Sequence, residues 1–249
     1  MATPRETRIH TSLLASVEKR CLVWMAQRLP PSINSDHLTA LGGLAMVATG
    51  VCYWAASTRP ISLEVAVFFL ILNWFGDSMD GTLARVRKHE RPRYGFYVDH
   101  VLDALGILFL TAGLVLGGFM SPAIGAGFLL AYYLLTIEIA LATHTVGTFR
   151  ISYWKFGPTE LRILVAVGTL QLLRSSHVTI FGSQQLLFDV GGAVAIIGLL
   201  GTFVVSAITN TRLLYRIEPL ERQSTIEINN QQSTIKQSAI GNLQSAIYG

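Results

Sequence analysis

Four aspartates lie in one short part of the sequence, spaced so that they form stripes on helices. The chain reads D-S-M-D-G-T-L-A-R over residues 77–85 and then, after nine residues, G-F-Y-V-D-H-V-L-D over residues 95–103. The first stripe, at positions i, i+3, i+4, i+7 and i+8, consists of Asp77, Asp80, Gly81, Ala84 and Arg85. The second stripe, at i, i+4 and i+8, consists of Gly95, Asp99 and Asp103. Residues with these spacings share one face of an α-helix.

The two stripes are expected to face each other. A connection of nine residues makes the two helices antiparallel neighbours, so that the four carboxylates share one pocket. An unpaired charge near hydrocarbon costs about 2.5 kcal/mol or more, so these carboxylates need compensation. Carboxylate oxygens hold Mg²⁺ or Mn²⁺, and four carboxylates suffice for one or two ions together with substrate phosphates. The pattern therefore predicts a divalent-metal site.

The other residues of the first stripe suit a phosphate ester. Gly81 and Ala84 have little side-chain volume, which lets a ligand approach the helix backbone closely. Arg85 can present a fork of donors to a phosphate or orient a carboxylate. The structural alternatives are a solvated acidic face and a small-residue packing contact. Acids inside a membrane usually mark functional sites, so four aspartates in two adjacent apolar segments favour a diphosphate-ester site.

The elements that position these residues are predicted to be membrane helices. Of the 249 residues, 51% are hydrophobic and only 14% are charged. The mean hydropathy is +0.47, and this composition is typical of a membrane protein. A spanning helix needs about 20 mostly apolar residues, so we predict an all-α polytopic membrane protein with six transmembrane helices. These helices are expected at residues 38–57, 62–85, 95–118, 122–146, 158–174 and 188–214.

Two segments flank a six-helix transmembrane catalytic domain of residues 32–217. Residues 1–31 form an N-terminal segment whose apolar spacing predicts an amphipathic helix, lying either on the membrane surface or on the protein's own surface. Residues 218–249 are rich in Gln, Ser, Asn and Ile, which predicts a mobile tail or a short surface helix. The two cysteines, Cys21 and Cys52, indicate neither a disulfide framework nor a metal site.

The basic residues predict the orientation in the membrane. Six spans place both termini on one side, and most Lys and Arg residues fall on that side, whereas Arg59 and Arg174 fall on the other. The positive-inside rule therefore puts the termini, the 86–94 loop, the 147–157 loop and the acidic site on the cytoplasmic face. The net charge of +4 is no argument for nucleic-acid binding.

The complete motif, D-x-x-D-G-x-x-A-R, a short loop and G-x-x-x-D-x-x-x-D, resembles the signature of the CDP-alcohol phosphotransferase family. Every motif position matches over 27 residues, with a loop slightly longer than is usual in the family. The resemblance implies a metal-dependent membrane enzyme of phospholipid synthesis. Such an enzyme transfers a substituted phosphoryl group from a CDP-alcohol to an acceptor hydroxyl and releases CMP. The resemblance also implies a homodimer.

The same resemblance implies roles for individual residues. The expected ligands of the metal site, two Mg²⁺ or Mn²⁺ ions, are Asp77, Asp80, Asp99 and Asp103. The residues expected to contact the CDP moiety are Gly81, Ala84 and Arg85. Asp103 is also expected to be the general base, because a carboxylate within hydrogen-bond reach can take the proton of the acceptor hydroxyl.

The substrates remain open between two classes. One class uses CDP-diacylglycerol with a polar alcohol, and the other uses CDP-choline or CDP-ethanolamine with diacylglycerol. Residues 143–163 resemble the choline and ethanolamine phosphotransferase branch. The polar residues best placed to shape an acceptor pocket are Glu138, His144, Arg150, Lys155 and Glu160.

Two other functions compete with this interpretation. An aspartate-rich membrane prenyltransferase also holds a diphosphate through metal, but the D-G-x-x-A-R continuation favours a CDP donor. A cation or proton transporter also places acids in membrane helices. Neither internal repeats nor interrupted helices around the membrane midplane are evident in the sequence, although a transporter would favour them.

Overall fold

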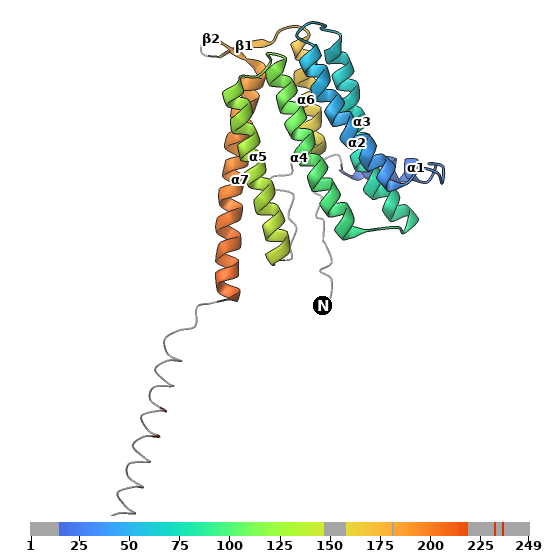
Figure 1. The fold of residues 1–249 in the computed structure, drawn as a ribbon, viewed down its shortest axis with the longest axis vertical. Coiled ribbons are helices and arrows are strands. Elements are labelled where there is room, and N and C mark those ends of the chain that lie inside the picture. Colours follow the sequence, from blue (N-terminus) through green and yellow to red (C-terminus); the bar gives the residue numbers. More distant parts are fainter. Residues whose placement is uncertain (1–14, 147–157, 181, 219–231, 233–235, 237–249) are drawn as a thin grey trace, which may run out of the picture. The chain divides into compact units, whose positions relative to one another are not determined.

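The computed structural model describes residues 15–146, 158–180 and 182–218, together with residues 232 and 236. For residues 15–17 and 158–160 it describes the backbone only. The chain divides into two units, residues 1–206 and 207–249, and the four aspartates of the motif lie in the first. Figure 1 shows the helices and strands of the described residues. The helices are α1 (Ala15–Ala26), α2 (Ser35–Ala55), α3 (Ser62–Arg87), α4 (Pro92–Leu116), α5 (Pro122–Val146), α6 (Pro158–Leu172) and α7 (Leu187–Ile217). Two strands, β1 (His177–Ile180) and β2 (Ser183–Leu186), pair antiparallel between α6 and α7.

Five helices, α2, α3, α4, α5 and α7, are long and apolar enough to cross a membrane, so the chain is a multi-pass membrane protein. They lie where five of the six spans were predicted. The remaining predicted span, residues 158–174, is the 15-residue helix α6, whose apolar part runs from Leu161 to Leu172. Since a full crossing needs about 20 residues, the sixth span stays a prediction.

Local sequence signals fix where the site-bearing helices begin and end. Asn34 caps α2, because its side chain accepts a hydrogen bond from the backbone N–H of His37 at 3.0 Å. Helix α3 ends at Arg87, and the next residue, Lys88, adopts a left-handed conformation with φ 57°. Pro92 occupies the first turn of α4, where a missing N–H costs nothing. The turn between Lys88 and Pro92 therefore connects the two acidic helices and reverses the direction of the chain between them.

Helix α2 is the common packing partner of the two acidic helices. Helices α3 and α4 both pack against α2 rather than mainly against each other, which corrects the expectation of two directly adjacent helices. Glycines bring the backbones together: a Cβ added at Gly76 of α3 would lie 2.6 Å from the backbone nitrogen of Gly42 in α2. On the other side, a Cβ at Gly113 of α4 would lie 2.1 Å from the carbonyl oxygen of Gly50. Small residues of this kind allow close approach of membrane helices.

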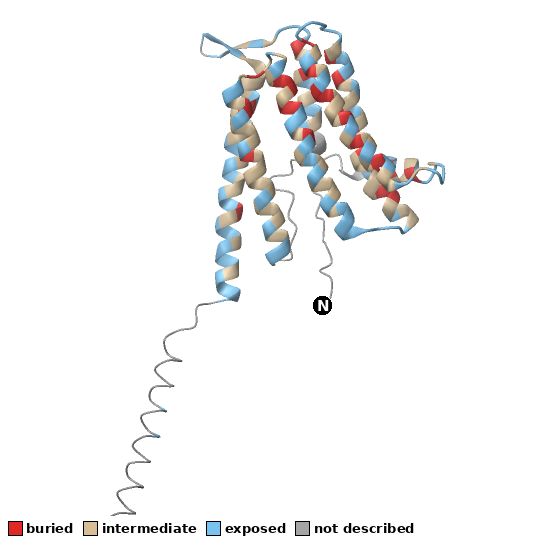
Figure 2. Cartoon of the chain, viewed as in Figure 1, coloured by how far each residue is buried: buried red, intermediate tan, exposed pale blue. Residues whose placement is uncertain are grey.

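Buried residues concentrate on these three helices (Figure 2). One buried cluster joins Tyr53 of α2 to Leu70 of α3, Leu114 of α4 and Leu172 of α6. The Tyr53 hydroxyl is also within 2.5 Å of the Thr169 hydroxyl on α6. The apolar half of the bundle therefore holds α6 beside α2 and α3.

A helix, α1, lies within the predicted N-terminal segment and packs on α3; its amphipathic character stays a prediction. Leu22 and Ala26 of α1 are buried in one cluster with Met79 and Leu83 of α3. Glu18 of α1 accepts hydrogen bonds from the Trp74 indole at 2.9 Å and from the Ser78 hydroxyl at 3.4 Å. Of the two alternatives for this helix, packing on the protein is thus observed, while a position on the membrane surface remains a prediction.

The Arg87 guanidinium is hydrogen-bonded to the segment between α1 and α2. Arg87, at the end of α3, donates to the backbone carbonyls of Leu29 at 2.9 Å and Pro30 at 3.0 Å, and also to that of Ile33. These carbonyls lie in the segment between α1 and α2. Arg87 therefore ties the start of α2 to the end of α3, the region that carries the acidic residues.

The close contact between α2 and α4 leads to a stability prediction. Gly113→Ala places a methyl group 2.1 Å from the Gly50 carbonyl oxygen, so the helices must separate. Overpacking of about 1–3 kcal/mol corresponds to a fall in Tm of roughly 2–12 °C, measured by thermal unfolding in detergent. Gly198→Ala is the control, because nothing lies within 4 Å of its added Cβ. An unchanged Tm for Gly113→Ala would contradict the packing described.

Candidate active site

Three of the four predicted aspartates converge at one place between α3 and α4. One carboxylate oxygen each from Asp77, Asp99 and Asp103 lies within 4.8 Å of the other two. Asp77 and Asp99 are half-buried, and Asp103 is exposed. Like charges this close repel, and oxygen ligands at this separation suit a hard divalent cation better than a soft one. The donor set therefore fits Mg²⁺ or Mn²⁺.

The fourth aspartate, Asp80, does not belong to this group of three, and its side chain is hydrogen-bonded to α2. Its Oδ2 accepts a hydrogen bond from the Thr39 hydroxyl at 2.6 Å. Its Oδ1 accepts from the backbone N–H of Gly81 at 2.5 Å. Both oxygens are thus held by donors, which fixes the orientation of the carboxylate.

Arg162 of α6 reaches the acidic cluster and was not among the predicted site residues. Its Nη2 lies 2.6 Å from Oδ2 of Asp77, and the two side chains are only 16% and 29% exposed. The sequence did carry a signal, because a charged residue inside an apolar segment is costly and usually pairs. The choice of partner was not readable from the sequence, since Asp77 is 85 residues away.

The residues predicted to contact the CDP moiety form one surface on α3. The Arg85 guanidinium donates to the Thr82 hydroxyl at 3.2 Å. It also lies over Gly81, where an added Cβ would be 3.4 Å from Arg85 Nη1. Ala84, on the same stripe, is half-buried, whereas Arg85 is exposed. This surface combines a small-residue floor with an exposed guanidinium.

The predicted acceptor-pocket residues are only partly described. Glu138 is half-buried on α5, and His144, near the end of that helix, is exposed. Arg150 and Lys155 lie outside the described residues, and for Glu160 only the backbone is described, as part of α6. Most of the stretch that resembles the choline and ethanolamine branch lies outside the described residues as well.

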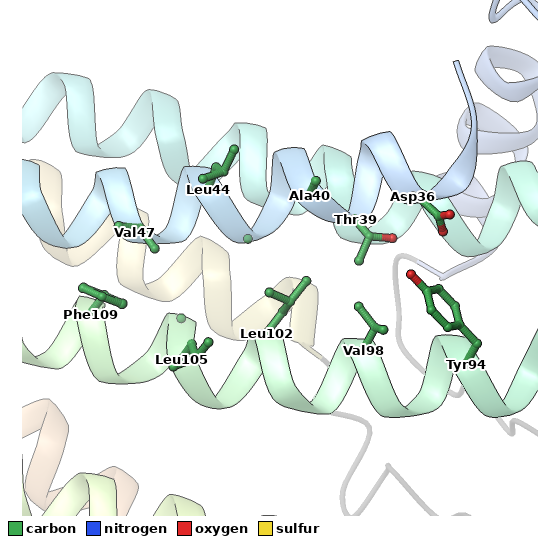
Figure 3. Close-up of a pocket in the computed structure, with 12 residues that line it drawn as sticks. Asp36, Thr39, Ala40, Leu44, Val47, Tyr94, Val98, Leu102, Leu105 and Phe109 are labelled. Atoms are coloured by element: carbon green, nitrogen blue, oxygen red, sulfur yellow. The ribbon is translucent and has the colours of Figure 1, made fainter. Parts of the chain in front are cut away.

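An apolar groove of about 430 Å³ runs between α2 and α4 (Figure 3). Its walls carry the side chains of Ala40, Leu44 and Val47 from α2 and of Val98, Leu102, Leu105 and Phe109 from α4. The polar residues Asp36, Thr39 and Tyr94 line one end. Arg91 borders that end, because its guanidinium is paired with Asp36 and lies 4.2 Å from the centre of the Tyr94 ring. Thr39, which lines the groove, donates its hydroxyl hydrogen bond to Asp80, so the groove adjoins this carboxylate.

Comparison with known families decides among the possible uses of this site. The family model for CDP-alcohol phosphatidyltransferases matches residues 34–207. The chain belongs to this family. No curated protein matches the chain significantly.

The match to the CDP-alcohol phosphatidyltransferase family covers the helices that carry the acidic site. The matched residues include the acidic helices α3 and α4, helix α2 with Thr39, and α6 with Arg162. Members are transferases of phospholipid synthesis that take a CDP-alcohol and are typically metal-dependent. The membrane helices and the carboxylate cluster agree with this. Membership therefore favours a transferase over the prenyltransferase and transporter alternatives.

Proposed function

We propose that this phosphatidyltransferase moves a substituted phosphoryl group from a CDP-alcohol to an acceptor hydroxyl and releases CMP. The observation that carries the proposal is the approach of Asp77, Asp99 and Asp103 to within 4.8 Å in the family domain. A diphosphate brings further negative charge to this place, so the reaction needs positive charge there.

The four aspartates of the motif are the proposed ligands of two divalent ions. When bound, Mg²⁺ or Mn²⁺ neutralises the diphosphate and stabilises the leaving CMP. Asp77, Asp99 and Asp103 offer oxygens from two helices, and Asp80 is held in place by Thr39. Rigid support of this kind keeps ligands oriented.

The residues around the proposed metal site bind the CDP-alcohol and take the proton of the acceptor. The floor made by Gly81 and Ala84 lets the CDP group lie close to α3, and Arg85 binds a phosphate of the donor. Asp103 takes the proton of the acceptor hydroxyl. The acceptor oxygen then attacks the phosphorus that carries the alcohol. The bond from that phosphorus to the bridging oxygen breaks, and CMP leaves with the electron pair.

A lipid is one substrate in either class of reaction. CDP-diacylglycerol carries the acyl chains in the first class, and diacylglycerol carries them in the second. The groove between α2 and α4 supports a lipid substrate, because its lining is apolar and its polar end adjoins the acidic site. We keep both classes open, with residues 143–163 favouring choline or ethanolamine donors by resemblance.

We also propose a homodimer with the site at the cytoplasmic face. The dimer rests on the family resemblance alone. The orientation rests on the distribution of Lys and Arg, which include Arg85, Arg87 and Arg91 close to the acidic ends of α3 and α4.

The test is CMP release by purified protein in detergent with Mg²⁺ or Mn²⁺. One reaction contains CDP-diacylglycerol and pooled polar alcohols, and the other contains CDP-choline or CDP-ethanolamine with diacylglycerol. CMP is expected from one donor set only, which identifies the class. Absence of CMP from both sets, in folded protein that binds metal, would argue for a prenyltransferase or a transporter instead.

A further inference from the structure

Arg162 forms an ion pair with Asp77, one of the carboxylates proposed to bind the metal. The guanidinium contacts Asp77 Oδ2 at 2.6 Å, and that carboxylate belongs to the group within 4.8 Å of Asp99 and Asp103. Both partners are largely shielded from solvent, at 16% and 29% exposure. In such surroundings charges interact more strongly than in water.

The contact conflicts with metal binding through the same oxygen. Mg²⁺ sits about 2.0–2.1 Å from its oxygen ligands, close to where the Arg162 guanidinium donates. A divalent ion and a guanidinium at one oxygen repel each other, and the repulsion is little reduced where water is scarce. Full metal coordination by Asp77 therefore favours displacement of the guanidinium.

We propose that Arg162 is an exchangeable counter-charge of the metal site. It neutralises Asp77 while the site holds no metal, and it releases Asp77 when a divalent ion binds. Arg162 is thus a positioning residue that keeps three close carboxylates compatible with a folded, metal-free protein. This inference rests on the proposed metal-dependent function and adds a named competitor for the metal.

The exchange predicts the direction of a change in affinity. Arg162→Gln removes the competing charge, so Mg²⁺ is expected to bind on the order of tenfold more tightly than in the wild type. Arg162→Lys keeps the charge and is expected to bind Mg²⁺ nearly as the wild type does. The metal-free Arg162→Gln protein should be less stable, because the carboxylates lose their compensation. Saturating Mg²⁺ should restore its stability.

The experiment is a Mg²⁺ titration of full-length protein in detergent, with Tm and calorimetric Kd as readouts. The matched control is Arg59→Gln, because Arg59 is exposed just before the start of α3, at the opposite end of this helix from Asp77, and its loss should leave the Kd for Mg²⁺ unchanged. A gain in Mg²⁺ affinity for Arg162→Gln, absent in Arg162→Lys and Arg59→Gln, is the expected result.

Two results would overturn the inference while leaving the proposed function intact. One is Mg²⁺ affinity in Arg162→Gln equal to or weaker than in the wild type. The other is an Arg162→Gln protein that is equally destabilised with and without Mg²⁺, which would assign the ion pair a structural role only. Failure of the wild type itself to bind Mg²⁺ or Mn²⁺ would instead overturn the proposed metal site, and this inference with it.

Discussion

Replacement of Asp103 by Asn is expected to lower the rate of CMP release by about 10²–10⁴-fold. The substitution keeps the shape of the side chain but removes its ability to take a proton. It also weakens one of the three carboxylates that lie within 4.8 Å of one another. The measurement is CMP release at saturating substrate and metal, with Mg²⁺ affinity determined separately so that loss of the base is distinguished from loss of the ion.

Glu64→Gln is the control for this experiment. Glu64 is an exposed carboxylate in the first turn of α3, at the end of the helix opposite Asp77 and Asp80. Its substitution should leave the rate unchanged. Retention of more than about a tenth of the activity in folded Asp103→Asn protein would assign the general base to another group.

Removal of divalent metal is expected to reduce CMP release on the order of a thousandfold, since metal contributes several kcal/mol to such reactions. The physical reason is repulsion between the carboxylates of the cluster and the substrate diphosphate. Treatment with a chelator, followed by dialysis and measurement of the residual metal content, gives the metal-free protein. Addition of Mg²⁺ or Mn²⁺ should restore the rate. Full activity in protein shown to contain no metal would contradict the proposed mechanism.

Metal should also stabilise the fold. A ligand that binds only the native state raises the free energy of unfolding by about 2.7 kcal/mol at 100 times its Kd. Tm is therefore expected to rise with Mg²⁺ in the wild type. The chelated protein should lose this rise together with its activity, which links the two readouts to one site.

The sequence predicted the local arrangement of the site well. The i, i+3 and i+4 spacings are properties of a helix by itself, so they correctly placed Asp77 on one face of α3 and Asp99 and Asp103 on one face of α4. The convergence of these three side chains agrees with part of the predicted pocket, in which Asp80 was expected to be the fourth carboxylate. The roles assigned to them, as ligands and base, remain proposals for the experiments above.

Contacts between distant parts of the chain were not predictable in the same way. Thr39 is 41 residues from Asp80, and Arg162 is 85 residues from Asp77. Arg162 is a charged residue in an apolar segment, a signal that suggests a partner without naming it. Thr39 follows Ser35, Asp36 and His37 at the start of α2, where a polar residue gives no such signal. The short strands β1 and β2 were missed because two four-residue strands give too little alternation to be recognised.

The role of α2 was also not apparent, because its glycines have no chemical signature. Gly42 and Gly50 belong to no motif that indicates a function. Only the structure reveals that the backbones of α3 and α4 contact α2 at these two glycines. The short connection between α3 and α4 suggested direct packing instead. The packing of both helices on α2 explains why a short connection need not mean direct contact.

Because both acidic helices pack on α2, this helix sets the distance between their aspartates. Gly76 rests on α2 at Gly42, and Gly113 rests on it at Gly50, so the gap between the aspartates is set by two contacts that lie outside the gap. A substitution at either contact can therefore behave like the loss of a metal ligand while every ligand is intact. Among the described residues, the Thr39 hydroxyl makes the one side-chain hydrogen bond from α2 to the aspartates. A genetic screen for inactive variants should nevertheless find as many substitutions in α2 as in the helices that carry the aspartates.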